Sequence, residues 1–370
     1  MEQKNFDPDG VGVDNGTYFG LPFAPETAEL VLISAPWDVT VSYGAGAAYA
    51  PDAIIEASTQ LDFHDPLAPG VWRRGIGSAL GGMVILSGIP NNWFNKRRGI
   101  ATADVDYSLL ESSQRLRADA ARVIDHLEGG GCLEDDYVVR KVRRVNEGCM
   151  SMNANVGAQA SRWLDAGKTV GLVGGDHSTP YGLIRALGAR HAAFGILHVD
   201  AHCDLRDAYE GFEFSHASIM FNVLRDVPQV TKIAQVAVRD FSESEAALAA
   251  SSGRVATFDD LSLAAALFRG ETWDAQCRRI VDALPQEVYV SFDIDALTFE
   301  NCPHTGTPVS GGLTFNQAVW LLDTLTRSGR RIIGFDVVEV CPAPDERIDA
   351  ITGARMLWKL CGQTLKSNES

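Results

Sequence analysis

Residues 193–204 read AFGILHVDAHCD, an apolar run that is followed at once by aspartate and histidine. The apolar part predicts a buried strand. Because side chains alternate along a strand, Asp200, His202 and Asp204 should leave the sheet on the same side. Carboxylates and imidazoles are common ligands of divalent metal ions. This stretch therefore predicts a strand whose carboxyl end carries three metal-binding side chains.

Two further stretches have the same design. Residues 288–295 read VYVSFDID and residues 169–177 read TVGLVGGDH, so one run ends at Asp293 and Asp295 and the other at His177. In open α/β sheets, ligands gather at the carboxyl ends of the strands. Two imidazoles and four carboxylates are too many ligands for one tetrahedral ion, but they suit two divalent ions bridged by shared carboxylates and a water. The pattern therefore predicts a two-metal centre and a hydrolytic reaction.

Each of these aspartates, taken alone, has a structural explanation. Aspartate at a strand end often caps a helix or forms a turn. Burying several carboxylates together without a cation is costly, because like charges repel in a medium of low dielectric constant. Three such clusters at three strand ends therefore favour the metal site over the structural explanation.

The order of apolar patterns predicts an α/β fold. Strands are expected at 30–34, 169–173, 193–199, 233–238, 254–258, 287–293 and 331–335, and helices at 51–58, 111–127, 133–164, 179–191, 242–250, 273–284, 314–328 and 349–362. Such alternation is typical of a mostly parallel sheet covered by helices on both faces. Residues 1–28 predict an extended arm that packs on a neighbouring surface or subunit, and 29–370 a single catalytic domain. Within it, 62–108 is expected to be an irregular excursion.

Composition limits the function classes. The chain has 370 residues, 46% of them hydrophobic, which suffices for a sizeable core. The net charge of −16 argues against nucleic-acid binding and favours a small cationic substrate. Seven cysteines without paired spacing argue against a disulfide framework or a zinc ribbon. No apolar signal core opens the chain, and no run approaches the roughly 20 residues that span a bilayer. These features predict a soluble cytoplasmic protein with no membrane partner.

Combined motifs then point to a family. The segments GGDHS (174–178), HVDAHCD (198–204) and SFDID (291–295) resemble the three metal-binding signatures of the ureohydrolase superfamily, which contains the arginases and agmatinases. The resemblance continues through TGTPVSGGLT (305–314) and GFDVVEV (334–340). It implies a three-layer αβα fold around an eight-stranded, parallel sheet, a binuclear metal centre, and cleavage of a guanidino C–N bond.

The resemblance also implies ligand sets for two divalent ions. One ion would be held by His177, Asp200, Asp204 and Asp293, and the other by Asp200, His202, Asp293 and Asp295. Asp200 and Asp293 would then be the bridging carboxylates. Two cations that share a water lower its pKa far enough to supply hydroxide near neutral pH. Asp204 is expected to accept a hydrogen bond from that hydroxide and to orient it.

Two further residues match family positions. Glu339 matches the carboxylate that receives the guanidinium, whose planar fork of donors suits a bidentate carboxylate. An ion-paired glutamate at a strand end is the alternative. His216 matches a histidine near the mouth of the active site that can pass a proton to the leaving amine, and its unperturbed pKa suits that work. The family's usual His-Gly is His216-Ala217 here, so the local backbone is expected to differ.

Substrate choice depends on the loops. Arginases and typical agmatinases carry a Gly-x-Arg-x-Gly-Pro-like segment after the first loop, whereas this chain reads SYGAGAAYAP at residues 42–51. That segment is more similar to the branch of guanidine and metformin hydrolases, for which nickel is the implied metal and manganese the alternative. Guanidine hydrolases favour tryptophan where this chain has Thr307, which predicts a wider pocket. Tyr43, Thr307 and His304 join Glu339 and His216 as predicted substrate-binding residues, whereas Cys203 is expected to pack in the core and His198 to support the metal ligands.

The resulting hypothesis is a hydrolase of guanidine or of a metformin-like substituted guanidine or biguanide, which releases ammonia or an amine. An agmatinase or guanidinobutyrase that releases urea is the alternative. A catalytically inactive subunit that supports an active paralogue in a mixed oligomer is a third possibility. The presence of all six metal-ligand residues argues against it. A histone-deacetylase-like enzyme is a further alternative, but its single-zinc site needs fewer ligands than this sequence offers. The resemblance implies a homo-oligomer, either a trimer or a hexamer.

Overall fold

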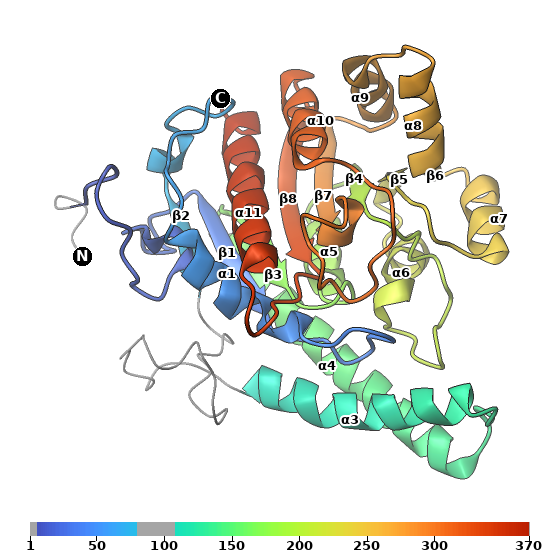
Figure 1. Ribbon diagram of the computed structural model, residues 1–370. Helices are drawn as coiled ribbons and strands as arrows, with labels where there is room; N and C mark the ends of the chain where they lie inside the picture. Colours follow the sequence, from blue (N-terminus) through green and yellow to red (C-terminus); the bar gives the residue numbers. More distant parts are fainter. Residues whose placement is uncertain (1–5, 80–107, 370) are drawn as a thin grey trace.

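The computed structural model describes residues 6–79 and 108–369. Its strands are β1 Leu30–Ala35, β2 Ile76–Ala79, β3 Thr169–Gly174, β4 Phe194–Val199, β5 Val230–Val236, β6 Val255–Phe258, β7 Glu287–Asp293 and β8 Arg331–Val338. They form one eight-stranded sheet in the order β2-β1-β3-β8-β7-β4-β5-β6, with every described pair parallel (Figure 1). The predicted parallel α/β sheet is confirmed.

Helices cover both faces of this sheet. They are α1 Ala50–Ser58, α3 Ser108–Glu128, α4 Asp136–Asp165, α5 Tyr181–Gly188, α6 Ile219–Asp226, α7 Glu243–Ser251, α8 Asp260–Phe268, α9 Trp273–Asp282, α10 Phe315–Arg327 and α11 Ile348–Ser367. One apolar core joins the sheet to α1, α9, α10 and α11, and a second joins it to α3, α4, α5 and α6. Figure 1 shows α3 and α4 running side by side at the margin of the molecule. The three-layer αβα architecture is therefore confirmed.

The central strands are apolar because both of their faces are covered. Strands β1 and β4 are buried along their whole length. Parallel strands must be joined by crossovers, and the helices that provide these crossovers cover the two faces. The strands therefore read as short continuous apolar runs, which is why the sequence pattern predicts them well.

Three elements were not predicted. Strand β2 lies within 62–108, the predicted irregular excursion, and forms an edge of the sheet; residues 80–107 lie outside the described part. Helices α6 and α8 are short, with eight and nine residues. Strand β8 continues to Val338, beyond the predicted end at 335, because Asp336 is a polar residue inside the strand. A buried polar residue interrupts the apolar run of a strand, so the pattern alone ends β8 too early.

The described part of the N-terminal arm packs on the chain itself. Tyr18 and Phe19 are buried, and the Tyr18 hydroxyl lies 2.7 Å from Ser34 Oγ in β1. The Phe19 ring meets Trp358 of α11 edge-on, with 4.9 Å between the ring centroids. The arm was expected to pack on a neighbouring surface or on another subunit, and these contacts are with a neighbouring surface of the same chain. Within residues 6–79 and 108–369, no helix has the length and apolar character of a membrane span.

Candidate metal centre and active site

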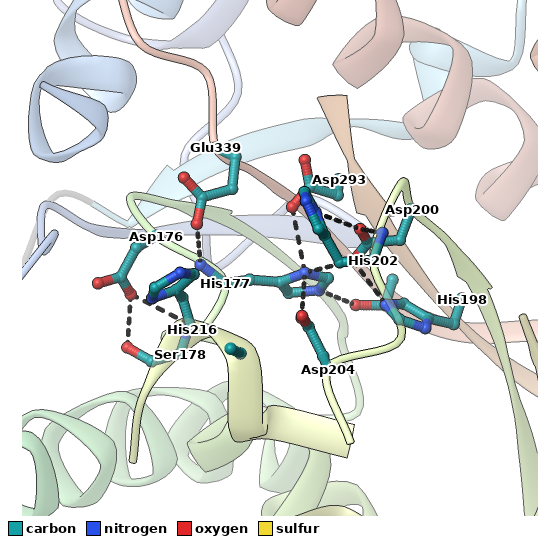
Figure 2. Close-up of polar contacts among 12 residues, drawn as sticks. Asp176, His177, Ser178, His198, Asp200, His202, Asp204, His216, Asp293 and Glu339 are labelled. Carbon is teal, nitrogen blue, oxygen red and sulfur yellow. Dashed lines mark hydrogen bonds and ion pairs between the residues drawn. The ribbon is translucent and has the colours of Figure 1, made fainter. Parts of the chain in front are cut away.

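The predicted metal ligands meet at the carboxyl ends of three strands. His177 follows β3, Asp200 begins the loop after β4, and Asp293 ends β7. In Figure 2 these side chains, with those of His202 and Asp204, point toward one another. The crossover connections of the parallel sheet bring all of these strand ends to the same edge.

The first part of the cluster is centred on the His177 ring. Its Nδ1 lies 2.9 Å from Asp200 Oδ2, 3.1 Å from Asp204 Oδ2 and 3.2 Å from Asp293 Oδ2. A single ring nitrogen carries at most one hydrogen, so it cannot donate well to three oxygens at once. One nitrogen and three carboxylate oxygens directed at a common point are the arrangement expected around a cation.

The second part of the cluster shares Asp200 with the first. His202 Nδ1 lies 3.1 Å from Asp295 Oδ2 and 3.4 Å from Asp200 Oδ1. Asp293 Oδ1 accepts the backbone N–H of Asp295 at 2.9 Å, so these two carboxylates are held together. Asp200 thus faces both histidines, as a bridging ligand should.

The electrostatics of the cluster fit bound divalent ions. Burial raises the pKa of Asp293 well above its ordinary value, and the neighbouring Asp295 and Asp200 raise it further. Within residues 6–79 and 108–369, the buried atoms His177 Nδ1, Asp204 Oδ2 and Asp295 Oδ2 have no hydrogen bond of normal geometry. Buried polar atoms are nearly always satisfied, and a cation between these atoms would satisfy them. The donor set therefore fits the two implied metal ions.

A buried hydrogen-bond network contacts the His177 ring at Nε2, on the side away from the carboxylates. Ser291 Oγ lies 2.9 Å from His177 Nε2 and donates to Asp336 Oδ2 at 2.8 Å; the Tyr289 hydroxyl donates to the same oxygen at 2.7 Å. Because the Ser291 hydrogen goes to Asp336, Ser291 accepts from Nε2–H. In the neutral imidazole, the form that binds a metal, this arrangement leaves His177 Nδ1 unprotonated. Sequence analysis missed this support, although Tyr289, Ser291 and Asp293 alternate on one face of β7.

Ser291→Ala is expected to weaken metal binding by about 10- to 100-fold, because His177 loses the acceptor that fixes its ring and tautomer. Calorimetric titration of the metal-free protein with nickel or manganese measures the effect. Ser251→Ala, at the exposed end of α7, serves as the control and should leave the affinity unchanged. Equal affinities in the two variants would remove Ser291 from the metal site.

His198 supports the cluster from the β4 side. Its Nε2 lies 2.7 Å from Asp200 Oδ2, and its Nδ1 lies 3.2 Å from Gln235 Nε2. Gln235 in turn donates to the carbonyl of Cys203 at 2.7 Å. Cys203 itself is buried in the core, as expected. His198 therefore orients a predicted bridging carboxylate, which agrees with its expected supporting role.

Glu339 lies beside the cluster, directly after β8. Its Oε1 accepts the backbone N–H of His177 at 2.8 Å, whereas its buried Oε2 has no hydrogen-bond partner among the described residues. Because each carboxylate oxygen can accept two hydrogen bonds, the bond from His177 to Oε1 leaves the predicted bidentate role of Glu339 open to a ligand. The Glu339 backbone has φ +61°, and Asp204 has φ +55°, a region that is unfavourable for side chains other than glycine. The fold thus holds both carboxylates in strained backbone positions.

A cavity of about 260 Å³ opens onto the cluster. It is lined by Ser42, His202, Asp204, Arg206, Tyr209, His216, Ala217, Asp240, Glu245 and Thr307. His216 and Thr307 thus lie where sequence analysis expects them. Sequence analysis did not predict Arg206 as a cavity residue. Its guanidinium stacks over the Tyr209 ring at 4.7 Å, and its Nε lies 3.7 Å from Glu245 Oε2. The available signal was the cationic Arg206 between Asp204 and Asp207 in the loop after β4.

Two predicted substrate-binding residues lie elsewhere. The Tyr43 side chain is 83% exposed and does not line this cavity, whereas its neighbour Ser42 does, because successive side chains of the loop point in different directions. His304 Nδ1 lies 2.9 Å from Asp349 Oδ2, and the His304 backbone N–H donates to the same carboxylate. His304 therefore ties its loop to the first turn of α11 and is also absent from the cavity lining.

His216 sits on the cavity wall in its neutral form. Burial, together with the charges of His202 and His177, lowers the pKa of His216 to about 3. The expectation of an unperturbed pKa is therefore wrong for this state of the protein. The His216 backbone N–H donates to Thr40 Oγ1 at 3.1 Å, which links the loop before α6 to the loop after β1.

Known proteins resemble this chain in sequence. An N(1)-aminopropylagmatine ureohydrolase of Thermus thermophilus is 29% identical over 93% of this chain and 93% of its own length. An agmatinase of Cronobacter sakazakii is 33% identical over 90% of this chain and 86% of its own.

Solved structures agree at the level of the fold. The agmatine ureohydrolase of Thermoplasma volcanium superposes with a TM-score of 0.66 at 20% identity, over 95% of this chain and 94% of its own. The proclavaminate amidino hydrolase of Streptomyces clavuligerus gives 0.66 at 21% identity, over 95% and 97%. The sequence model of the arginase family matches residues 83–362. The chain therefore belongs to the arginase family and is a metal-dependent ureohydrolase.

Proposed function

We propose that this protein binds two divalent metal ions and cleaves a C–N bond of a small guanidine-type cation. One observation carries the proposal: the backbone N–H of His177 holds Glu339 while the His177 ring faces the carboxylates of the cluster. A guanidinium bound to the free Oε2 of Glu339 would therefore lie beside the metal ions. The excess of carboxylates here and the net charge of −16 both favour a cationic substrate.

The six clustered side chains would hold the ions, with Asp200 and Asp293 as shared ligands. When bound, the ions supply a water of lowered pKa as the nucleophile. Nitrogen and carboxylate donors accept either nickel or manganese, and we favour nickel. The proposal rests on the donor set and on the resemblance of the loop at 42–51 to the guanidine hydrolase branch.

The chain's own residues would divide the remaining work. Glu339 binds the guanidinium and orients its carbon toward the cluster. Asp204 accepts a hydrogen bond from the nucleophile and so directs its attack. His216, on the cavity wall, would pass a proton to the departing nitrogen, which leaves as ammonia or an amine; this role requires a pKa near neutral in the filled site.

Guanidine and methyl-substituted guanidines or biguanides are our leading substrates. The first loop lacks the arginine of typical agmatinases, and the small Thr307 forms part of the cavity wall. Agmatine or a longer guanidino amine is the second candidate, since the relatives described above carry those names. A guanidino acid such as 4-guanidinobutyrate belongs to the same alternative.

A substrate panel separates these candidates. Guanidine, metformin, agmatine, arginine and 4-guanidinobutyrate are compared by kcat/KM on protein loaded with nickel or with manganese. We expect the compact or methyl-substituted compounds to lead and arginine to fall at least about 100-fold below them. The α-carboxylate of arginine would lose its water on entering the cavity, and that loss is costly without a positively charged partner. The cation of the cavity wall, Arg206, already lies 3.7 Å from Glu245 Oε2. A lead for agmatine would select the second candidate. Two bound metals without activity on any compound would contradict both.

A further inference from the structure

We infer that His304 is a positioning residue of the active site: its pairing with the buried Asp349 fixes the loop that carries Thr307 on the cavity wall, and so sets the affinity for substrate. The described lining of that cavity does not include His304 itself. The inference rests on the proposed function and adds to it a residue that acts on the substrate through another. It starts from Asp349, a buried carboxylate that takes no part in the proposed reaction.

Both oxygens of Asp349 serve His304. Asp349 lies in the first turn of α11 and is fully buried. Its Oδ1 accepts the His304 backbone N–H at 3.0 Å, and its Oδ2 lies 2.9 Å from the ring Nδ1. An ionised carboxylate only accepts hydrogen bonds, so Nδ1 carries the hydrogen of this contact. The His304 side chain therefore supplies one of the donors that a buried carboxylate needs.

The other neighbour of Asp349 is a thiol. Burial, together with the Asp349 carboxylate beside it, raises the pKa of the Cys302 thiol well above its ordinary value. Cys302 therefore stays uncharged and brings no positive charge to the carboxylate. Over the described ranges 6–79 and 108–369, the ion pair of Asp349 is the one with His304.

The loop that carries His304 is closed at its base. The Thr298 backbone N–H donates to the Leu313 carbonyl at 2.9 Å, and the Leu313 N–H donates to the Ala296 carbonyl at 2.9 Å. These backbone bonds stand between the loop and Asp295, a predicted metal ligand in the turn that precedes it. A shift at the tip of the loop therefore leaves the metal cluster in place.

The three residues that follow the paired histidine all reach the active site. The Thr305 hydroxyl donates to the Glu339 carbonyl at 3.0 Å. The Gly306 carbonyl accepts the Gly44 backbone N–H at 2.9 Å. Thr307 then lines the cavity beside the cluster. Because Thr307 stands three residues after the histidine, release of the imidazole lets this segment shift.

His304 thus controls the position of Thr307 without touching the substrate. Loss of the imidazole leaves the Asp349 carboxylate buried without its cationic partner, and the loop relieves that cost by admitting water and shifting. A shifted Thr307 changes the width of the cavity and weakens the binding of a compact substrate. The metal cluster keeps its place, so KM and not kcat should carry the effect.

Three substitutions of one residue test the inference. His304→Ala is expected to raise KM for the best substrate of the panel about tenfold and to change kcat by less than about twofold. His304→Asn places an amide N–H at the position of Nδ1, so it should keep KM within about twofold of the wild-type value. His304→Gln places its amide at the position of Nε2 and should behave like His304→Ala. A KM in His304→Ala equal to that of the wild type, or in His304→Asn as high as in His304→Ala, would overturn the inference.

His126→Ala is the matched control. His126 Nε2 lies 2.7 Å from Asp135 Oδ2 near the turn between α3 and α4, and its side chain is 33% exposed, against 38% for His304. Removing this second histidine–aspartate pair should leave KM, kcat and metal content unchanged. Melting temperatures establish that each variant is folded.

Hydrogen exchange tests the loop without any substrate. In protein loaded with manganese, peptides that cover residues 298–312 should exchange faster in His304→Ala than in the wild type or in His304→Asn, whereas peptides from β7 should not change. Unchanged exchange of residues 298–312 in His304→Ala would overturn the inference. Wild-type protein without activity on any compound of the panel would refute the proposed function, and the exchange data would still decide whether His304 holds the loop.

Discussion

Asp200→Ala is expected to remove both metal ions and to lower kcat by roughly 10⁴-fold or more. Asp200 is the carboxylate that both parts of the cluster share: Oδ2 lies 2.9 Å from His177 Nδ1, and Oδ1 lies 3.4 Å from His202 Nδ1. Loss of this one side chain therefore withdraws a ligand from both ions at once. Elemental analysis of the purified variant gives the metal content, and a substrate assay gives the turnover.

The fold should survive this substitution, because β4 is buried by its apolar residues and Asp200 lies beyond its end. Circular dichroism and thermal melting check that point. Asp207→Ala changes an exposed aspartate of the same loop and should keep both ions. Asp293→Ala is expected to behave like Asp200→Ala. Retention of two tightly bound ions in either variant would contradict the assignment of these carboxylates as bridges.

Glu339→Gln is expected to keep the metals and lose the substrate. Glutamine can still accept the His177 N–H, but it presents a neutral amide to the guanidinium in place of an ionised oxygen. Removing one partner of a buried charged pair costs about 3 kcal/mol, so kcat/KM should fall more than about 100-fold. Steady-state kinetics together with elemental analysis measure both effects.

The matched control for Glu339→Gln is Glu147→Gln, which changes an exposed glutamate of α4 that pairs only with Arg143 among the described residues. It should leave both the kinetics and the metal content unchanged. If Glu339→Gln lost its metals, or kept normal kinetics on the best substrate, Glu339 would be a structural residue. The proposed orientation of the substrate would then fail, while the metal assignment would stand.

Sequence analysis predicted the candidate metal ligands because each follows directly after an apolar strand. In a parallel sheet, the crossovers bring such strand ends to one edge, so proximity along the sheet could be inferred without coordinates. The family resemblance, and not the strand pattern, placed Thr307 and His216 near the site. It could not place side chains within loops, which is why Tyr43 was expected in the cavity and its neighbour Ser42 lines it.

The sequence by itself thus determined the fold class, the run of buried strands and the residue types of the metal cluster, since apolar periodicity and strand-end motifs are local features. Only the tertiary structure decided the rest. It joined Ser291 to Asp336 across β7 and β8, and it brought the backbone N–H of His177 to Oε1 of Glu339. These contacts link residues far apart in the chain, and their strength depends on burial and on distances of a few ångströms. No spacing along a sequence encodes those distances.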